Sequence, residues 1–157
     1  MSFLKSPFVG HAFLRFDVTG RPQPGGSKRA FIHKATGRAV ITDDNPKAKR
    51  WMADVAEAAL ATGCELYEGP MEVEAIFRQE RPLGHYGTGK NAGVLKDKAP
   101  FYKTNKPDAT KLWRSTEDAL TGIVWKDDAQ IVKQTITKRY VGHGEKTGVQ
   151  ITARRLD

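Results

Sequence analysis

The stretch Lys106–Gln130, KPDATKLWRSTEDALTGIVWKDDAQ, is the most informative part of this 157-residue chain about its fold. Small or apolar side chains recur in it at three- and four-residue spacing: Leu112, Thr116, Ala119, Leu120 and Ile123. This spacing predicts a helix over about 107–121 with one stripe facing a core. Gly122 is typical of a helix end, and the β-branched run over 131–141 predicts that a strand follows.

Outward from this stretch, the chain alternates between strand-like and helix-like patterns. Further strands are predicted at 13–18, 30–33, 39–42, 71–78 and 148–156, and a further helix at 46–62. The order β-β-β-α-β-loop-α-β-β predicts one α+β domain over 1–157, with two main helices on a small mixed sheet. The segment 80–106 has no regular period and carries six Lys or Arg against two acids. A connection of this length is typically functional or disordered.

Charge is distributed unevenly along the chain. Lys and Arg number 26 against 18 Asp and Glu, a net charge of +8. Residues 1–50 hold ten Lys or Arg and three Asp, so this part alone has a net charge of +7. A surplus of this size indicates a polyanionic partner. We therefore expect a basic N-terminal region over 12–50 and a basic loop over 80–106.

Several function classes are disfavoured. No run is long enough to span a membrane, and the N-terminus lacks the apolar core of a signal peptide, so we expect a cytoplasmic protein without membrane partners. The single cysteine, Cys64, allows no intrachain disulfide. Residues 84–90 fit the phosphate-loop pattern GxxxxGK, but Asn91 stands where Ser or Thr is needed. Gly93 interrupts the helix that would have to follow, so we expect no nucleotide cofactor.

Carboxylates flank the predicted helix over 107–121. Asp108 opens it, and Asp127 and Asp128 precede the next strand. Because the chain turns back after Gly122, the two groups could converge. Carboxylates clustered on a basic protein predict an Mg²⁺ or Mn²⁺ site. The alternative is that Asp108 caps the helix and that Asp127 and Asp128 shape a turn.

Segment 106–130 closely resembles the signature of the RusA family of Holliday-junction resolvases. Its most specific parts are Asp-Ala-Leu at 118–120 and Asp-Asp-Ala-Gln at 127–130. The loop at 20–25 and the basic hairpin are similar to the family's N-terminal region, and residues 85–95 resemble a loop of phage-encoded members. The resemblance implies a RusA-like fold and a homodimeric, Mg²⁺-dependent endonuclease. Such enzymes cut four-way DNA junctions symmetrically during recombination and repair.

The resemblance also implies roles for individual residues. The family's first metal-binding Asp falls on Asp108 and its later one on Asp128, beside Asp127. We therefore expect these three acids to bind Mg²⁺, with Mn²⁺ able to substitute. The family's second Asp falls on Thr110, which contributes no charge, and its catalytic Lys falls on Arg114.

Two further assignments follow from helical spacing. Lys111, three residues after Asp108, is the reserve candidate for the role of Arg114 at the scissile phosphate. Glu117 is a less favoured additional ligand, and Asp118 is expected to pair with Arg114.

The basic residues are expected to follow DNA backbones without reading sequence. They are Lys28, Arg29, Lys34, Arg38, Lys47, Lys49, Arg50, Lys103 and Lys106. The main alternative is a non-catalytic junction- or RNA-binding module that has lost a metal ligand at Thr110. A structural nucleoprotein that binds duplex and junction alike is a third possibility.

Overall fold

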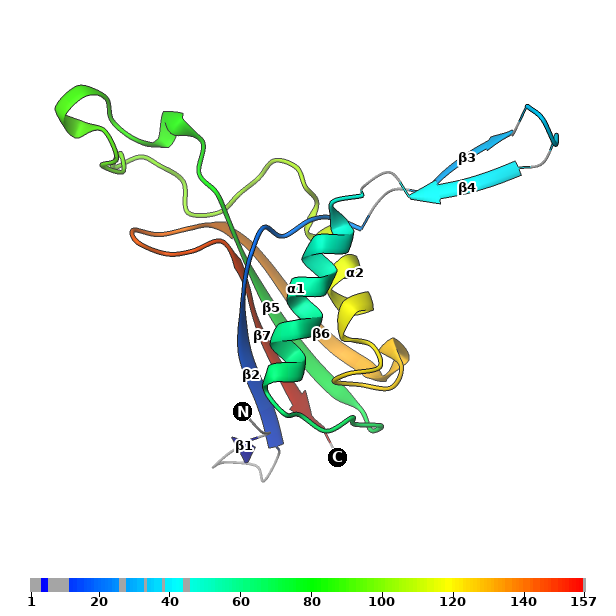
Figure 1. Cartoon of the computed structure of the whole chain (residues 1–157). Coiled ribbons are helices and arrows are strands. Elements are labelled where there is room, and N and C mark those ends of the chain that lie inside the picture. Colours follow the sequence, from blue (N-terminus) through cyan, green and yellow to red (C-terminus); the bar gives the residue numbers. More distant parts are fainter. Residues whose placement is uncertain are drawn as a thin grey trace.

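The computed structural model of this chain describes residues 4–5, 12–25, 28–32, 34–37, 39–43 and 46–156. Its main sheet has the order β1-β2-β7-β5-β6 (Figure 1). The strands are β1 (Leu4–Lys5), β2 (Ala12–Thr19), β5 (Met71–Gln79), β6 (Ile131–Tyr140) and β7 (Gly148–Arg155). A separate antiparallel hairpin consists of β3 (Lys28–Ile32) and β4 (Ala39–Asp43).

Two helices cover one face of the main sheet (Figure 1). They are α1 (Ala48–Ala61), which lies against β2, and α2 (Ala109–Leu120), which lies against β6. Strands β5 and β6 are parallel neighbours, and α2 lies in the connection between them. Strand β7 is antiparallel to both β5 and β2. The predicted α+β fold with a mixed sheet and two main helices is confirmed.

The core lies between the sheet and the two helices. Alternate residues of the strands face inward, as the period of two requires. The fully buried side chains include Leu14, Val18, Val55, Val73, Phe77, Leu112, Leu120 and Ile151. A buried hydrogen bond also joins the helices, because Trp51 Nε1 donates to Thr116 Oγ1 at 3.1 Å. Helix α2 is therefore fixed against α1 and the sheet along its apolar stripe.

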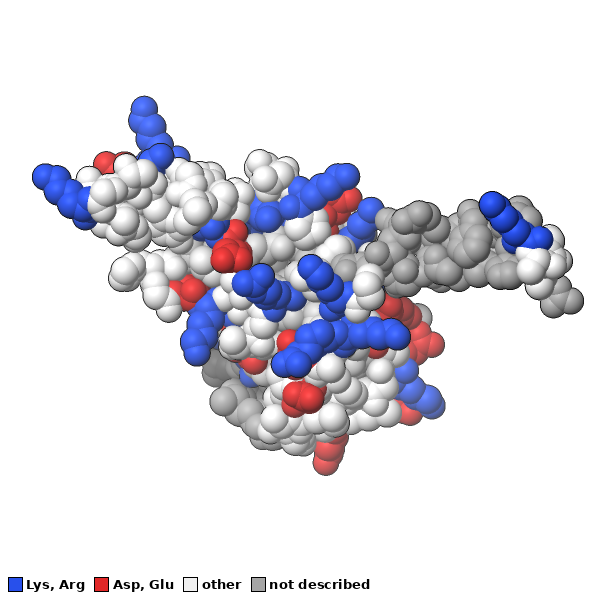
Figure 2. Space-filling view, turned by 45° about the horizontal axis from the view of Figure 1, so that its top comes forward, with Lys and Arg blue, Asp and Glu red and all other residues white. Residues whose placement is uncertain are grey.

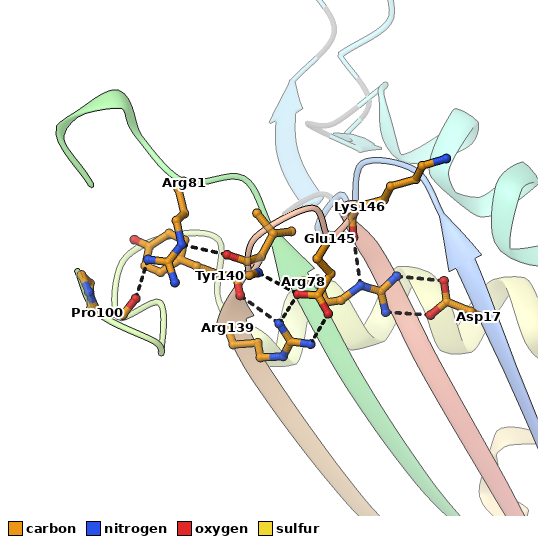
Figure 3. Close-up of polar contacts among 10 residues, drawn as sticks. Asp17, Arg78, Arg81, Pro100, Arg139, Tyr140, Glu145 and Lys146 are labelled. Carbon is orange, nitrogen blue, oxygen red and sulfur yellow. Dashed lines mark hydrogen bonds and ion pairs between the residues drawn. The ribbon is translucent and has the colours of Figure 1, made fainter. Parts of the chain in front are cut away.

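The connection between β6 and β7 crosses the end of β5, so these two consecutive strands do not pair with each other. Arg139 clamps this connection by donating to both carboxylate oxygens of Glu145, at 2.6 and 2.8 Å (Figure 3). The backbone N–H of Gly142 donates to the same carboxylate at 2.8 Å. At Gly148 a Cβ atom would overlap the carbonyl of Val18 on β2, so the start of β7 requires glycine.

Two segments extend beyond the two layers of sheet and helices (Figure 1). One is the β3–β4 hairpin. The other is the predicted irregular segment after β5, which contains the 3₁₀ turns η1 (Leu83–His85) and η2 (Gly89–Asn91) and no α-helix. The phosphate-loop-like pattern at 84–90 thus leads into a short turn. None of the helices in the described ranges is long and apolar enough to cross a membrane.

Helix α1 begins after Lys47, which makes no side-chain capping bond. The residues just before Pro46, Asp44 and Asn45, lie outside the described residues.

Candidate active site

Three carboxylates converge where α2 ends. Oxygen atoms of Glu117, Asp118 and Asp128 all lie within 4.8 Å of one another. We call these residues the acidic cluster. Asp118 and Asp128 are exposed, whereas Glu117 is half-buried. Within the described part of the chain, no other three Asp, Glu, His or Cys side chains come this close together.

A folded-back turn brings Asp128 to the end of α2. Gly122 adopts a φ of 90°, which favours glycine, and its N–H donates to the carbonyl of Trp125 at 2.7 Å. The buried Trp125 ring donates from Nε1 to Thr121 Oγ1 at 3.0 Å. These bonds fix the direction in which the chain leaves the helix.

The same turn is tied to the segment before β5. Gln130 Nε2 donates to the carbonyls of Tyr67 and Gly69, at 2.8 and 2.9 Å. Asp127 caps the 3₁₀ turn η3 (Asp128–Gln130), because its carboxylate accepts from the N–H of Ala129 at 2.9 Å. Asp127 therefore has a structural partner of its own and positions Asp128, while Asp128 remains exposed beside the helix.

Glu117 has a perturbed acidity. Its partial burial raises the pKa of its carboxyl group, and the nearby carboxylates of Asp128 and Asp118 raise it further. The Trp113 indole acts in the opposite direction, but burial has the largest effect on this pKa. Negative charge at this position is therefore disfavoured until a cation compensates for it.

Asp108 lies at the other end of α2, as its first flanking residue. At a rise of 1.5 Å per residue, its backbone is about 15 Å along the helix from Asp118. It is also nine residues before Glu117, about half a turn around the helix axis. Within a single chain Asp108 therefore lies outside the acidic cluster, because the turn back occurs at the far end of the helix. The metal-binding role expected for Asp108 and Asp127 stays a prediction.

Asp108 has other surroundings. It lines a cleft together with Lys103, Lys106 and Lys111. Its carboxylate lies 4.0 Å from Lys111 Nζ, in a partly exposed ion pair. Lys111 is thus close to Asp108, as its spacing predicted.

Arg114 is exposed on α2, in a helical row with Thr110 and Asp118 at four-residue spacing. Its aliphatic stem lies next to Gly25, and the N–H of Gly25 donates to the carbonyl of Lys111 at 2.8 Å. Ser115 Oγ donates to the carbonyl of Gln23 at 2.6 Å. The loop at 20–25 thus packs on α2 and holds Arg114 on the side of the acidic cluster.

The predicted DNA-contacting residues with described side chains lie in three places, of which the cleft holds Lys103 and Lys106. Lys47, Lys49 and Arg50 are exposed at the start of α1, where Arg50 Nε contacts Asp54 Oδ1 at 3.2 Å. Lys34 is exposed in the hairpin turn. Arg38 lies outside the described residues, as do the side chains of Lys28 and Arg29. Figure 2 shows Lys and Arg side chains over the face between the two projecting segments, with acids among them.

The acidic cluster fits a hard divalent cation. Carboxylate oxygens are the ligands that Mg²⁺ and Mn²⁺ prefer, and few are needed because water completes the coordination. The raised pKa of Glu117 is consistent with this, since a cation would offset the repulsion among three acids. The sequence gives little reason to expect Glu117 as a metal ligand, because the case for it depends on its closeness in space to Asp128, eleven residues away along the chain.

Two comparisons with known proteins bear on this site. Residues 21–152 match the family described as endodeoxyribonuclease RusA. The chain is also 26% identical over 144 residues to "Uncharacterized protein YqaN" of Bacillus subtilis (strain 168). That similarity covers 91% of this chain and 96% of the Bacillus protein. The matched range contains the acidic cluster, Asp108, Arg114 and residues 21–25 of the loop at 20–25.

Proposed function

This chain belongs to the RusA family of endodeoxyribonucleases, and from that premise we propose that it resolves four-way DNA junctions with a divalent metal ion at the acidic cluster. The family makes it a hydrolase that acts on DNA. The finer proposal is that Mg²⁺ is the ion, that Glu117, Asp118 and Asp128 hold it, and that two copies act as a homodimer. A two-fold dimer suits the symmetry of a four-way junction.

The observation that carries the proposal is the convergence of three carboxylates on a chain with a net charge of +8. A protein that only binds DNA gains nothing from placing acids where phosphates approach. A bound divalent ion would polarise the phosphodiester and lower the pKa of a water molecule. Asp127 holds Asp128 in place through the turn that it caps.

Arg114 is the proposed stabiliser of the scissile phosphate. It lies one helical turn before Asp118, and a guanidinium can donate two hydrogen bonds to a phosphate group. Lys111 and Asp108, at the cleft, are proposed to position the DNA strand. Asp108 as a metal ligand, which the family resemblance implies, is the competing assignment.

The non-catalytic alternative rests on the loss of a metal ligand, because Thr110 stands where the family has its second Asp. Thr110 is outside the acidic cluster, so this replacement leaves the number of clustered acids unchanged. The single-chain geometry therefore favours a nuclease over a binding module that has lost its metal.

Cleavage of a 5′-labelled four-way junction in Mg²⁺ tests the proposal. The wild type is expected to cut opposite strands in pairs, and Asp128→Asn to lower the rate at least about 100-fold, because it removes a ligand. Asp97→Asn, an exposed acid on the loop, is the control and should cut at the wild-type rate. Equal cleavage by Asp128→Asn would contradict the metal site. Binding without any cleavage in Mg²⁺ or Mn²⁺ would favour the non-catalytic module.

A further inference from the structure

A cleft of about 830 Å³ opens at the end of α2 opposite to the acidic cluster. It lies where β5 and β6 end, between the loop at 21–24 and the segment at 103–108. Its lining combines apolar and charged residues. The apolar walls include Pro22, Pro82, Leu83, Pro107 and Tyr140. Positive charge comes from Arg21, Lys103, Lys106 and Lys111, and negative charge from Glu80 and Asp108.

The cleft is held open by a buried arginine. The Arg81 side chain donates from Nε to the carbonyl of Val141 at 2.8 Å and from Nη1 to the carbonyl of Pro100 at 2.7 Å (Figure 3). Its guanidinium lies 5.2 Å from the centre of the Tyr140 ring. Among the described residues no carboxylate forms an ion pair with it. These bonds tie β5, β6 and the 100–106 segment together, so the cavity and its positive charge are preformed.

Lys103 is a cation of the cleft that forms no ion pair among the described contacts. Its Nζ lies 5.7 Å from the centre of the Tyr140 ring. Burial, and after it the charge of Lys138, lowers the pKa of Lys103. Lys138 itself donates to the carbonyls of Asn105 and Pro107, at 2.7 and 2.8 Å. An anion bound at Lys103 would relieve this crowding of positive charge.

The acids of the cleft are already paired. Asp108 lies 4.0 Å from Lys111, and Glu80 lies 3.7 Å from Arg21. No acid that lines the cleft forms an ion pair with Lys103 or Lys106 among the described contacts. The site therefore has apolar walls together with positive charge available to a ligand.

We propose that this cleft receives a single unpaired nucleotide of a DNA strand. The base would lie against the apolar walls, and its phosphate would contact Lys103 and Lys106. A phosphate of duplex DNA needs only a flat basic surface, whereas a cavity of this size holds a small molecule. The inference rests on the proposed function, because a nuclease that acts on branched DNA can take a nucleotide out of its stack where the arms meet.

Binding of short oligonucleotides to the full chain in EDTA tests this inference without cleavage. The probes are a fluorescent thymidine pentamer, the same pentamer with an abasic centre and equal charge, and a duplex of equal length. The intact pentamer should bind about tenfold more tightly than the abasic one, because only the former presents the base. It should also bind more tightly than the duplex. Equal binding of the intact and abasic pentamers would reduce the cleft to a phosphate contact and overturn the proposal.

Lys103→Gln is the matching variant and should weaken pentamer binding about tenfold. Lys133→Gln, an exposed lysine on the sheet face that the helices do not cover, is the control and should bind within about twofold of the wild type. An equal loss in both variants would mean diffuse charge attraction and would contradict a site at the cleft.

The junction cleavage assay separates this inference from the proposed function. If junctions are cut while the abasic pentamer binds as well as the intact one, the cleft assignment is wrong and the nuclease stands. If the base matters for binding but no junction is cut, the proposed nuclease function is wrong and the nucleotide site stands.

Discussion

At the scale of single residues, Glu117 is the side chain whose surroundings differ most from those of an ordinary surface acid. It is half-buried beside Trp113 and faces two exposed carboxylates. Burial and like charge both oppose its ionised form and raise its pKa. This is the pattern of a site arranged for a ligand rather than for stability.

Replacing Glu117 with Gln is therefore expected to stabilise the metal-free protein at pH 7, raising Tm by about 1–2 °C. The folded state favours the protonated form of Glu117, so its ionised carboxylate destabilises the fold at pH values above the raised pKa. This is the destabilising penalty that Gln removes. It disappears as the pH falls below the ordinary carboxyl value of 4.5. Thermal unfolding of Glu117→Gln at pH 7 and at pH 4 measures both effects. Glu57→Gln, an exposed acid on α1, is the control and should leave Tm unchanged.

A lower Tm for Glu117→Gln at pH 7 would mean that the carboxylate stabilises the fold. With 10 mM Mg²⁺ the wild type is expected to have a higher Tm than Glu117→Gln, because bound metal stabilises only the protein that retains its ligands.

The sequence points to Asp128 more strongly than to Glu117, although the structure places both in the acidic cluster. Asp128 belongs to a specific local pattern, Asp-Asp-Ala-Gln at 127–130. Glu117 has no such pattern around it, and the structure places it beside Trp113 and the distant Asp128. Trp113 in turn packs near Trp125, with ring centres 6.3 Å apart. Such packing between distant residues has no signature in local spacing.

At the scale of elements, the connection from β6 to β7 depends on one ion pair. Arg139 and its hydrogen bonds lower the pKa of Glu145 to about 2. The carboxylate therefore stabilises the fold above its ordinary pKa, and this contribution is lost as the pH falls toward 2. The pair is only partly buried, with side-chain exposures of 17% for Arg139 and 34% for Glu145. Its contribution is thus at most about 1 kcal/mol.

The variant Glu145→Gln should lower Tm by about 2–4 °C at pH 7. The difference from the wild type should shrink as the pH is lowered from 4.5 to 2. Glu65→Gln, an exposed acid between α1 and β5, is the control with no expected shift. A deficit that persists unchanged at pH 2 would show that the loss is one of packing rather than charge.

The periodicity of the sequence predicts every long strand and both helices within a few residues. It does not predict strand partners. Strands β6 and β7 are consecutive, yet β5 lies between them. Alternation identifies which residues face the core, but the parallel partner of β6 is set by the crossover through α2, which involves residues sixty positions apart.

At the scale of the whole molecule, Lys and Arg side chains lie over the face between the two projecting segments (Figure 2), and this positive charge should govern affinity for DNA. Each lysine that contacts a duplex phosphate contributes about 0.9 to the slope of log K against log salt. Lys47→Gln with Lys49→Gln is expected to reduce this slope by about two for junction binding in EDTA.

Lys133→Gln is the control for the salt experiment. Lys133 pairs in register with Glu72, whose neighbours Met71 and Val73 face the core, so it lies on the sheet face that the helices do not cover. The slope of log K against log salt for Lys133→Gln should equal that of the wild type. A double variant with an unchanged slope would remove the start of α1 from the DNA-binding surface.

Helix α2 separates the acidic cluster from Asp108 and its cleft, although these acids all belong to the sequence segment 106–130. The acidic cluster lies at one end and the cationic cleft with Asp108 at the other, about 15 Å apart along the helix. From sequence the acids of 106–130 look like one set, because the signature does not show which side of the helix each occupies. Our proposal therefore places metal binding at one end of the helix and strand positioning at the other.

Calorimetric titration with Mn²⁺ tests this separation most directly, with wild type, Asp118→Asn and Asp108→Asn compared at pH 7. We predict that Asp118→Asn weakens Mn²⁺ binding at least about tenfold, because it removes one of three clustered carboxylates, and that Asp108→Asn binds within about twofold of the wild type. Loss of Mn²⁺ binding in Asp108→Asn, with Asp118→Asn unaffected, would contradict the acidic cluster as the metal site.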